Sequence, residues 1–253
     1  MSATKLIVGN WKMNGLLSDS RARAQQLGSA VAALENAGFD MVLCPPATMI
    51  GAVADVLAGS SVQYGGQDCH TEINGAFTGN ISAAMLKDLG CTHVIVGHSE
   101  RRQYQGEVSA LIAEKAAAAH AAGLVAIICV GETDEERSAG KADGVVAAQL
   151  AESLPLSATA ENTAVAYEPV WAIGTGKTAS TADIENMHAH IRAEVNARLL
   201  DGSAGLKLLY GGSVKAANAG EILHLKNVDG VLVGGASLVA DDFIAIAKAS
   251  ASA

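Results

Sequence analysis

Short apolar runs recur along the whole length of this chain. Each run is followed by Gly, Pro or a polar residue, and apolar residues within it are nearly continuous instead of alternating with polar ones. This pattern is typical of strands covered on both faces, as in a parallel sheet. The sequence therefore predicts eight strands, at Leu6–Val8, Met41–Cys44, Ser61–Tyr64, Thr92–Val96, Leu124–Val130, Thr163–Tyr167, Leu206–Tyr210 and Gly230–Val233.

Helical patterns fill the intervals between the runs. In the stretch 180–200, apolar residues follow helical spacing, and Ser180 with Asp183 resembles a capping box at its start. No Pro/Ser-rich linker, charge block or low-complexity tract interrupts the alternation, so we expect one domain spanning residues 1–253. Eight strand-helix units in a chain of 253 residues favour an α/β fold of the closed (β/α)₈ barrel type. An open doubly wound sheet remains the alternative on pattern alone.

Composition excludes several classes of partner. The formal net charge of −9 disfavours binding to nucleic acids or anionic membranes, because both need a basic surface. The four cysteines are widely spaced without a C-x-x-C pair, which indicates buried free thiols and neither a zinc site nor a disulfide framework. Residues 1–20 lack the apolar segment of a signal peptide, and no apolar run reaches the roughly 18 residues that span a bilayer. We therefore expect a soluble, cytoplasmic protein.

The unusual polar and glycine-rich segments all follow predicted strands. In a (β/α)₈ barrel the carboxyl ends of the strands meet at one rim, where the chemistry is located. The segments that follow the first, fourth, sixth, seventh and eighth runs are "NWKMN" at Asn10–Asn14, "VGHSERR" at Val96–Arg102, "YEPVWAIGTGKTA" at Tyr167–Ala179, "YGGSV" at Tyr210–Val214 and "VGGASL" at Val233–Leu238.

Each of these five segments resembles a motif of the triosephosphate isomerase family, in the same order and over essentially the whole chain. The resemblance implies a TIM barrel that interconverts dihydroxyacetone phosphate and D-glyceraldehyde 3-phosphate by proton transfer through an enediolate, in glycolysis and gluconeogenesis. It calls for no metal and no cofactor. Another phosphosugar-binding barrel enzyme would share the glycine-rich phosphate segments but would not need Lys12, His98 and Glu168 in these three loops. A non-catalytic barrel would be expected to lack one of them.

The resemblance also assigns roles to individual residues. Glu168 is the expected base, since a carboxylate that is partly removed from water is basic enough to move a proton between adjacent carbons. His98 is the expected electrophile, kept neutral by the amides of a short helix that "SERR" would start. Lys12 is expected to stabilise the developing negative charge, with Glu100 holding it in place and Asn10 adding a polar contact to substrate.

The glycine-rich segment after Glu168 could also be a nucleotide-binding loop, but its spacing argues against this. A Walker A motif needs glycine five positions before Gly176, where Trp171 stands. The match to a dinucleotide fingerprint is loose, because the segment does not directly follow a strand and no second strand ending in an acid comes after it. The resemblance implies a mobile lid, with "PVW" and "KTA" as hinges. Substrate phosphate would then be held by backbone N–H groups at Gly174, Ser213, Gly234 and Gly235.

One long loop, Gly65–Ser82, resembles the segment that enters the neighbouring subunit in this family. The resemblance implies a homodimer in which Thr78 lies near the active site of the other copy. Family members usually carry an acid where this chain has Asn80, and that acid meets an arginine of the other subunit, matched here by Arg101. If Arg101 lacks another acidic partner, Asn80→Glu is expected to tighten the dimer by on the order of 1 kcal/mol.

Overall fold

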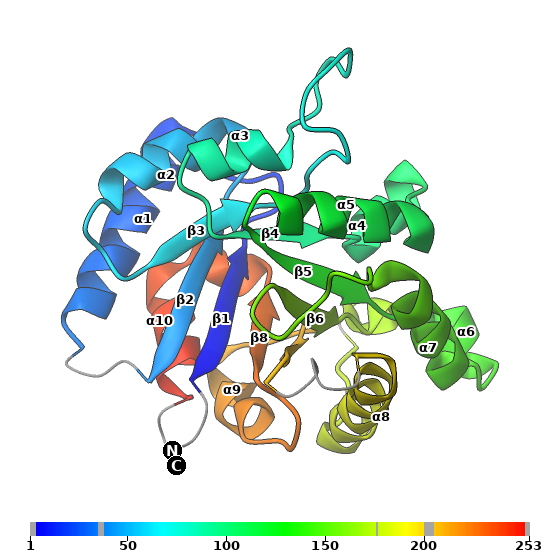
Figure 1. The fold of residues 1–253 in the computed structure, drawn as a ribbon. Coiled ribbons are helices and arrows are strands. Elements are labelled where there is room, and N and C mark those ends of the chain that lie inside the picture. Colours follow the sequence, from blue (N-terminus) through cyan, green and yellow to red (C-terminus); the bar gives the residue numbers. More distant parts are fainter. Residues whose placement is uncertain (1–3, 35–37, 176, 200–204, 251–253) are drawn as a thin grey trace.

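The computed structural model of the protein describes residues 4–34, 38–175, 177–199 and 205–250. Eight parallel strands form a closed barrel in chain order, with β8 pairing back to β1. Figure 1 shows helices packed around the outside of the barrel. The strands are β1 Lys5–Asn10, β2 Phe39–Cys44, β3 Gln63–Gly66, β4 His93–Val96, β5 Val125–Val130, β6 Thr163–Tyr167, β7 Lys207–Tyr210 and β8 Gly230–Val233. The predicted barrel is confirmed, and the open sheet is excluded.

The helices that surround the barrel include one or more after every strand. They are α1 Leu17–Ala32, α2 Ile50–Val56, α3 Ala83–Asp88, α4 Ser99–Gln105, α5 Ser109–Ala121, α6 Asp134–Ser138, α7 Ala142–Ser153, α8 Thr181–Leu199, α9 Ala216–Leu223 and α10 Ala240–Lys248, with short 3₁₀ turns η1 Ala47–Met49, η2 Val170–Ala172 and η4 Gly235–Leu238. The predicted capping box is present, since Ser180 and Asp183 exchange hydrogen bonds at the start of α8. No helix in the described ranges is both long and apolar enough to cross a membrane.

The strands read as continuous apolar runs because both of their faces are buried. In β1, Leu6 and Val8 belong to a cluster inside the barrel, whereas Ile7 belongs to the larger cluster between barrel and helices. Alternate residues of one strand thus enter two different apolar environments. All four cysteines are buried free thiols, as predicted.

The third strand is displaced by two residues from its predicted position. It runs over Gln63–Gly66 instead of Ser61–Tyr64. A Cβ at Gly65 would lie 2.3 Å from the His93 carbonyl oxygen, and one at Gly66 would lie 2.6 Å from a Leu86 methyl group. These glycines are therefore strand residues chosen for close packing, which an apolar pattern does not reveal.

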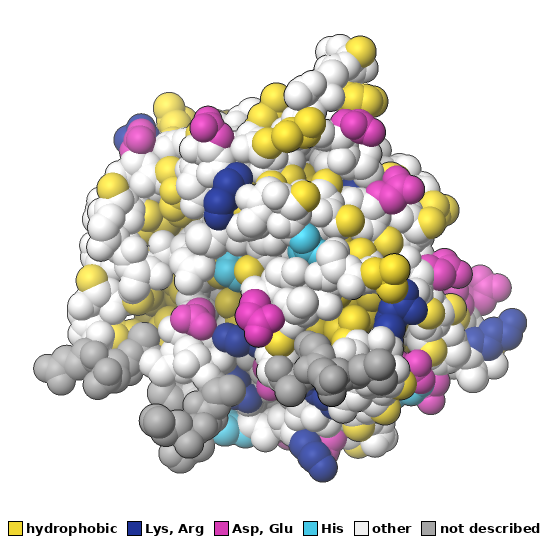
Figure 2. All heavy atoms as spheres, viewed as in Figure 1, with side chains coloured by type: hydrophobic (Ala, Val, Ile, Leu, Met, Phe, Trp, Pro, Cys, Tyr) yellow, Lys and Arg dark blue, Asp and Glu magenta, His cyan; other side chains and the backbone are white. Residues whose placement is uncertain are grey.

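The segment between β3 and α3 projects from the barrel (Figure 1). Its neck is closed by a backbone hydrogen bond from His70 to Ile81, and the His70 and Phe77 rings stack with centroids 4.1 Å apart. Figure 2 shows hydrophobic side chains on this projection, while charged side chains of both signs are scattered over the rest of the visible face. Ile73 is 69 % exposed on it and Phe77 is 41 % exposed.

Candidate active site

A cavity of about 330 Å³ opens at the carboxyl ends of the strands. It is lined by all eight residues that the sequence analysis assigned to catalysis or substrate binding: Asn10, Lys12, His98, Glu168, Gly174, Ser213, Gly234 and Gly235. They come from five different βα loops, so only the closed barrel brings them together. Lys215, which follows the "YGGSV" segment, also lines the cavity and was not anticipated from the sequence.

Glu168 directly follows β6 and is only 2 % exposed. Its backbone N–H continues the sheet by donating to Val130, which fixes where the side chain begins. One carboxylate oxygen accepts from the Ser99 N–H at 2.9 Å, and the other lies 3.2 Å from the Ser99 hydroxyl and 2.9 Å from His98 Nε2. Burial raises the pKa of Glu168, but His98 and the Ser99 donors outweigh it, so the net direction is downward. The group is therefore held as a carboxylate.

His98 caps the start of α4, where the sequence predicted a short helix. Its Nδ1 accepts the Glu100 backbone N–H at 3.2 Å, which places the proton of a neutral ring on Nε2, facing Glu168. Burial lowers the pKa of His98, while the adjacent Glu168 carboxylate raises it and sets the net direction upward. That upward effect depends on the charge of Glu168, so it ends once Glu168 has taken up a proton. A neutral His98 during the reaction stays a prediction.

Lys12 follows β1 in the left-handed backbone region, with φ of 50°. Two hydrogen bonds hold this strained backbone in place. The Lys12 N–H donates to the Asn10 side chain, and the Lys12 carbonyl accepts from the Gln67 side chain. The ammonium lies 2.5 Å from a carboxylate oxygen of Glu100. The expected pairing of Lys12 with Glu100 is thus present, and it aims the cation across the cavity that Glu168 also lines.

Backbone amides rather than cationic side chains dominate the other side of the cavity. No described residue accepts a hydrogen bond from the N–H groups of Gly174, Ser213 or Gly234. The turn η4 begins at Gly235 beside them, and a Cβ at Gly234 would come within 3.3 Å of the Lys12 side chain. Open amides next to a short helical start attract anions. This arrangement can bind a phosphate group without many basic residues.

The segment after Glu168 forms a flap between this cavity and a second one. Trp171 Nε1 and the Tyr167 hydroxyl both donate to the buried Glu132 carboxylate, at 2.8 and 3.1 Å. Farther along, Lys177 forms an ion pair with Asp134 at 2.9 Å. No role was predicted for Glu132 from the sequence, because its partners come from β6 and from the flap and meet it only after folding. Gly176 lies outside the described residues.

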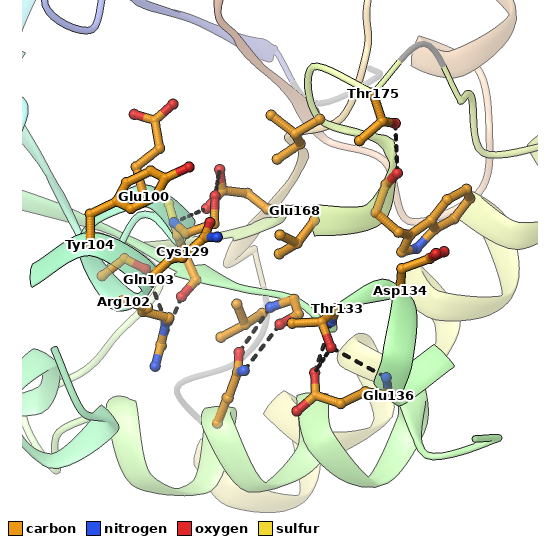
Figure 3. Close-up of a pocket in the computed structure, with 18 of the residues that line it drawn as sticks. Glu100, Arg102, Gln103, Tyr104, Cys129, Thr133, Asp134, Glu136, Glu168 and Thr175 are labelled. Atoms are coloured by element: carbon orange, nitrogen blue, oxygen red, sulfur yellow. Dashed lines mark hydrogen bonds between the residues drawn. The ribbon is translucent and has the colours of Figure 1, made fainter. Parts of the chain in front are cut away.

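The second cavity, of about 650 Å³, lies between the flap, α4 and the start of α6. Figure 3 shows side chains around it, Glu168 among them. Glu168 therefore lies in the wall between the two cavities. Among the described residues, no cluster of three or more His, Cys, Asp or Glu could hold a metal ion.

Fold and site together define a class: (β/α)₈ barrel enzymes with a buried carboxylate beside an imidazole, in a cavity lined by open backbone amides. Comparison with known proteins identifies the member of this class. The family model for triosephosphate isomerase matches residues 5–250. The chain is 55 % identical to triosephosphate isomerase of Afipia carboxidovorans, over 96 % of each chain, and 53 % identical to that of Jannaschia sp., over 99 % of this chain and 100 % of the relative.

A solved structure agrees with this result. The crystal structure of triosephosphate isomerase from Bartonella henselae superimposes with a TM-score of 0.91 at 44 % sequence identity, covering 98 % of this chain and all of the other. The chain belongs to the triosephosphate isomerase family. It is an isomerase that interconverts dihydroxyacetone phosphate and D-glyceraldehyde 3-phosphate, a reaction of glycolysis and gluconeogenesis. The alternatives of another phosphosugar enzyme and of a non-catalytic barrel are not supported.

Proposed function

We propose that Glu168, His98 and Lys12 carry out the isomerisation. Glu168 removes a proton from the carbon next to the substrate carbonyl and returns it to the neighbouring carbon. His98 donates its Nε2 hydrogen bond to the substrate oxygens as the enediolate forms, and Lys12 stabilises the negative charge. The observation that carries this proposal is the 2.9 Å contact between His98 Nε2 and Glu168 in a cavity that Lys12 also lines.

Glu168 is not free to act in the arrangement described. Ser99 donates two hydrogen bonds to its carboxylate and so holds it away from a bound substrate. We infer that Glu168 leaves Ser99 when substrate binds. Burial, which raises its pKa, then acts with fewer opposing hydrogen bonds, so the carboxylate becomes more basic at the point where it must accept a proton.

The substrate phosphate binds, in this proposal, to the backbone amides of Gly174, Ser213, Gly234 and Gly235, with Asn10 contacting the substrate from β1. Because Gly174 belongs to the flap, closing the flap on the phosphate completes the site and excludes water. Lys215 lines the same cavity and adds a second cation near the anion.

Substituting the base by aspartate tests the catalytic assignment. Glu168→Asp keeps the charge but withdraws the carboxylate by one methylene, so proton transfer slows while phosphate binding changes less. We expect kcat to fall by about 100-fold or more, roughly 2.7 kcal/mol in barrier. A coupled isomerisation assay on parent and variant measures this. A variant with kcat within about threefold of the parent, less than ~0.7 kcal/mol, would show that Glu168 is not the base.

We further propose that the protein works in the cytoplasm as a homodimer. Buried free thiols suit a reducing compartment. The projecting segment offers exposed Ile73 and Phe77, and Met13, which follows Lys12 in the active-site loop, is 94 % exposed. A second copy that covers these apolar side chains would place the projection, with Thr78, beside the active-site loop of its partner. Each site would then be braced from across the interface.

The structure changes what is expected of Asn80. Arg101 already has two acidic partners in its own subunit, Asp68 at 2.9 Å and Glu107 at 2.6 Å. The condition for the sequence-based prediction, an arginine without an acidic partner, is therefore not met. A third carboxylate would add repulsion, so we now expect Asn80→Glu to leave the dimer no tighter, or to weaken it.

Sedimentation of parent and Asn80→Glu across a dilution series, at low and high salt, measures both claims. Asn80→Gln is the matched control, since it has the same length without the charge. A monomeric parent would contradict the dimer, whereas a charged variant that dimerises more tightly than the control at low salt would contradict the revised expectation.

A further inference from the structure

Arg102 is a partly buried arginine in α4 whose role the reaction described above does not explain. Four of its hydrogen bonds go to neutral groups on different elements. Nε donates to the Gly97 carbonyl at 3.0 Å. One terminal nitrogen donates to the Ser109 hydroxyl at 3.0 Å, and the other donates to both the Cys129 carbonyl at 3.0 Å and the Ser153 hydroxyl at 3.2 Å. The fork of the guanidinium thus ties α4 to the ends of β4, β5 and α7 and to the start of α5.

The helix held in this way carries the groups that contact the base. His98 caps α4 and Ser99 is its first residue, and both bond to Glu168. A shift of α4 would therefore move the two partners of Glu168 together. A planar guanidinium, with donors fixed in direction, holds such a position better than a flexible ammonium can.

The charge of Arg102 is as unusual as its hydrogen bonds. Four other cations near Glu168 have an acidic partner: Lys12 has Glu100, Arg101 has Asp68 and Glu107, Lys177 has Asp134, and Arg137 has Glu132 and Asp183. Lys215, which lines the smaller cavity, has none among the described residues. Arg102 forms no salt bridge with any carboxylate in the part of the chain that the structure describes. Glu168 is bonded to His98 and Ser99, neither of which carries a permanent charge. Arg102 and Glu168 thus carry a full positive and a full negative charge without a close charged partner among the described residues.

Cys129 shows that these two charges are near each other. Its carbonyl accepts from Arg102, and its thiol has a pKa raised by burial and by the Glu168 carboxylate, while Arg102 acts in the opposite direction. Arg102, Cys129 and Glu168 also line the same cavity (Figure 3). Arg102 does not line the smaller cavity that holds the catalytic groups. It therefore acts on Glu168 from the side away from the substrate.

We propose that Arg102 is a positioning residue and the counter-charge of Glu168, fixing α4 through its hydrogen bonds and stabilising the ionised carboxylate through its charge. The proposal rests on Glu168 being the base. The other titratable or charged groups near Glu168 are His98 and Glu100 on the α4 segment, Cys129 on β5, Lys12 after β1 and Lys215 before α9. Glu107 and Glu152 also act on Arg102. Lys12 and Glu100 offset each other, and the buried Cys129 thiol is un-ionised.

Two substitutions of Arg102 separate its charge from its geometry. A cation near a carboxylate lowers its pKa, so removing the cation raises it. For Arg102→Met we expect the acid limb of kcat/KM to move up by about one pH unit, with kcat lowered by roughly tenfold from the displaced helix. Arg102→Lys keeps the charge without the fork, so kcat falls while the limb stays within about 0.3 pH unit. The substrate phosphate titrates identically in every profile, so only differences between variants are compared.

A second pair of variants leaves Arg102 in place, in case Arg102→Met does not fold. Ser109, the first residue of α5, accepts from Arg102, and an acid is tolerated at a helix start. Ser109→Asp gives Arg102 an acidic partner, whereas Ser109→Asn has the same shape without the charge. We expect the limb of the Asp variant to lie about half a pH unit or more above that of the Asn variant.

The outcomes separate this proposal from the catalytic assignment. The counter-charge role is supported if the acid limb of kcat/KM moves to higher pH in Arg102→Met and Ser109→Asp. The same limb should stay in place in Arg102→Lys and Ser109→Asn. If the acid limb lies at the same pH in the two Ser109 variants, the counter-charge role of Arg102 is overturned. If Glu168→Asp is strongly impaired but these limbs do not move, only the Arg102 proposal fails. If Glu168→Asp keeps the parent kcat, both fail. Arg198→Met removes another arginine, one that donates to the Leu154 carbonyl, and serves as a control that should leave the limb in place.

Discussion

The two ends of the barrel are built from the same eight strands but treat polar groups in opposite ways. At the amino end, the charged groups complete one another: Asp229 accepts from both Arg192 and the Leu208 N–H, Lys207 pairs with Asp40, and Lys5 donates to the Val228 carbonyl. At the carboxyl end, Gly174, Ser213 and Gly234 have backbone amides that no described residue accepts from, and Glu168 is held by bonds that must break. The polar groups at the amino end therefore stabilise the fold, whereas those at the carboxyl end are available to a ligand.

The two ends also differ in what depends on pH, which is stability at the amino end and the reaction at the carboxyl end. His93 at the start of β4 and His188, which bonds the Asn227 carbonyl, are buried at the amino end, and burial lowers the pKa of each to about 4. Such groups affect folding. His98 and Glu168 at the carboxyl end contact each other and affect the reaction. If the two ends differ in this way, changes at the carboxyl end should alter the reaction, and changes at the amino end should alter stability.

The largest effect is expected at the carboxyl end, from deletion of residues 173–176. The deletion removes phosphate contacts made by the closed flap and lets water reach the enediolate, whose phosphate is then eliminated. We expect a phosphate-bearing transition-state analogue to bind on the order of 100-fold more weakly, about 2.7 kcal/mol, and methylglyoxal and inorganic phosphate to be released. Calorimetric titration and a phosphate assay measure these two effects.

A matched control for the deletion is Asp134→Asn. It breaks the exposed Lys177 ion pair without removing a phosphate contact, so analogue affinity should change less than about twofold. Unchanged analogue affinity and no extra phosphate release in the deletion variant would remove the flap from the proposal.

A smaller effect is expected at the amino end, from Asp229→Ala. The substitution removes two hydrogen bonds and leaves Arg192 without its acid, so the free energy of unfolding should fall by about 2 kcal/mol. Asp229→Asn keeps an acceptor for the Leu208 N–H and should lose roughly half as much. Urea unfolding measures the stability, and kcat of both variants should stay within twofold of the parent. A large loss of kcat at full stability would show that the two ends are not separable.

The smallest effect concerns the acid sensitivity of folding. His93 is neutral in the folded protein down to pH about 4 but gains a proton near pH 6.5 when unfolded, so stability is lost as pH falls from 6.5 to 4. His93→Asn removes that loss. The free energy of unfolding of the variant should therefore depend less on pH, by about 1 kcal/mol between pH 7.5 and 5.5. Parallel pH dependence in parent and variant would show that His93 is not the source.

Much of the fold was predictable because a strand that is buried on both faces is a continuous apolar run in the sequence. Strands such as Thr163–Tyr167 and Gly230–Val233 were predicted to the residue, since each is a continuous apolar run ended by a polar residue or glycine. The third strand was misplaced because Gly65 and Gly66 serve close packing and carry no apolar signal. The eight candidate site residues were found through motifs, and the structure places all of them around one cavity.

The order of strands and helices, and the rim that carries the candidate site, could be predicted from local patterns and from the direction of parallel strands. Which charges face each other depends on how the closed barrel brings distant segments together. Nothing local distinguishes Arg101 from Arg102 in "SERR", yet one is paired with Asp68 and Glu107, while the other, among the described residues, bonds only neutral groups. Adjacent helix residues point in different directions, and their partners come from distant parts of the chain. Electrostatic roles of this kind arise only when the barrel has closed.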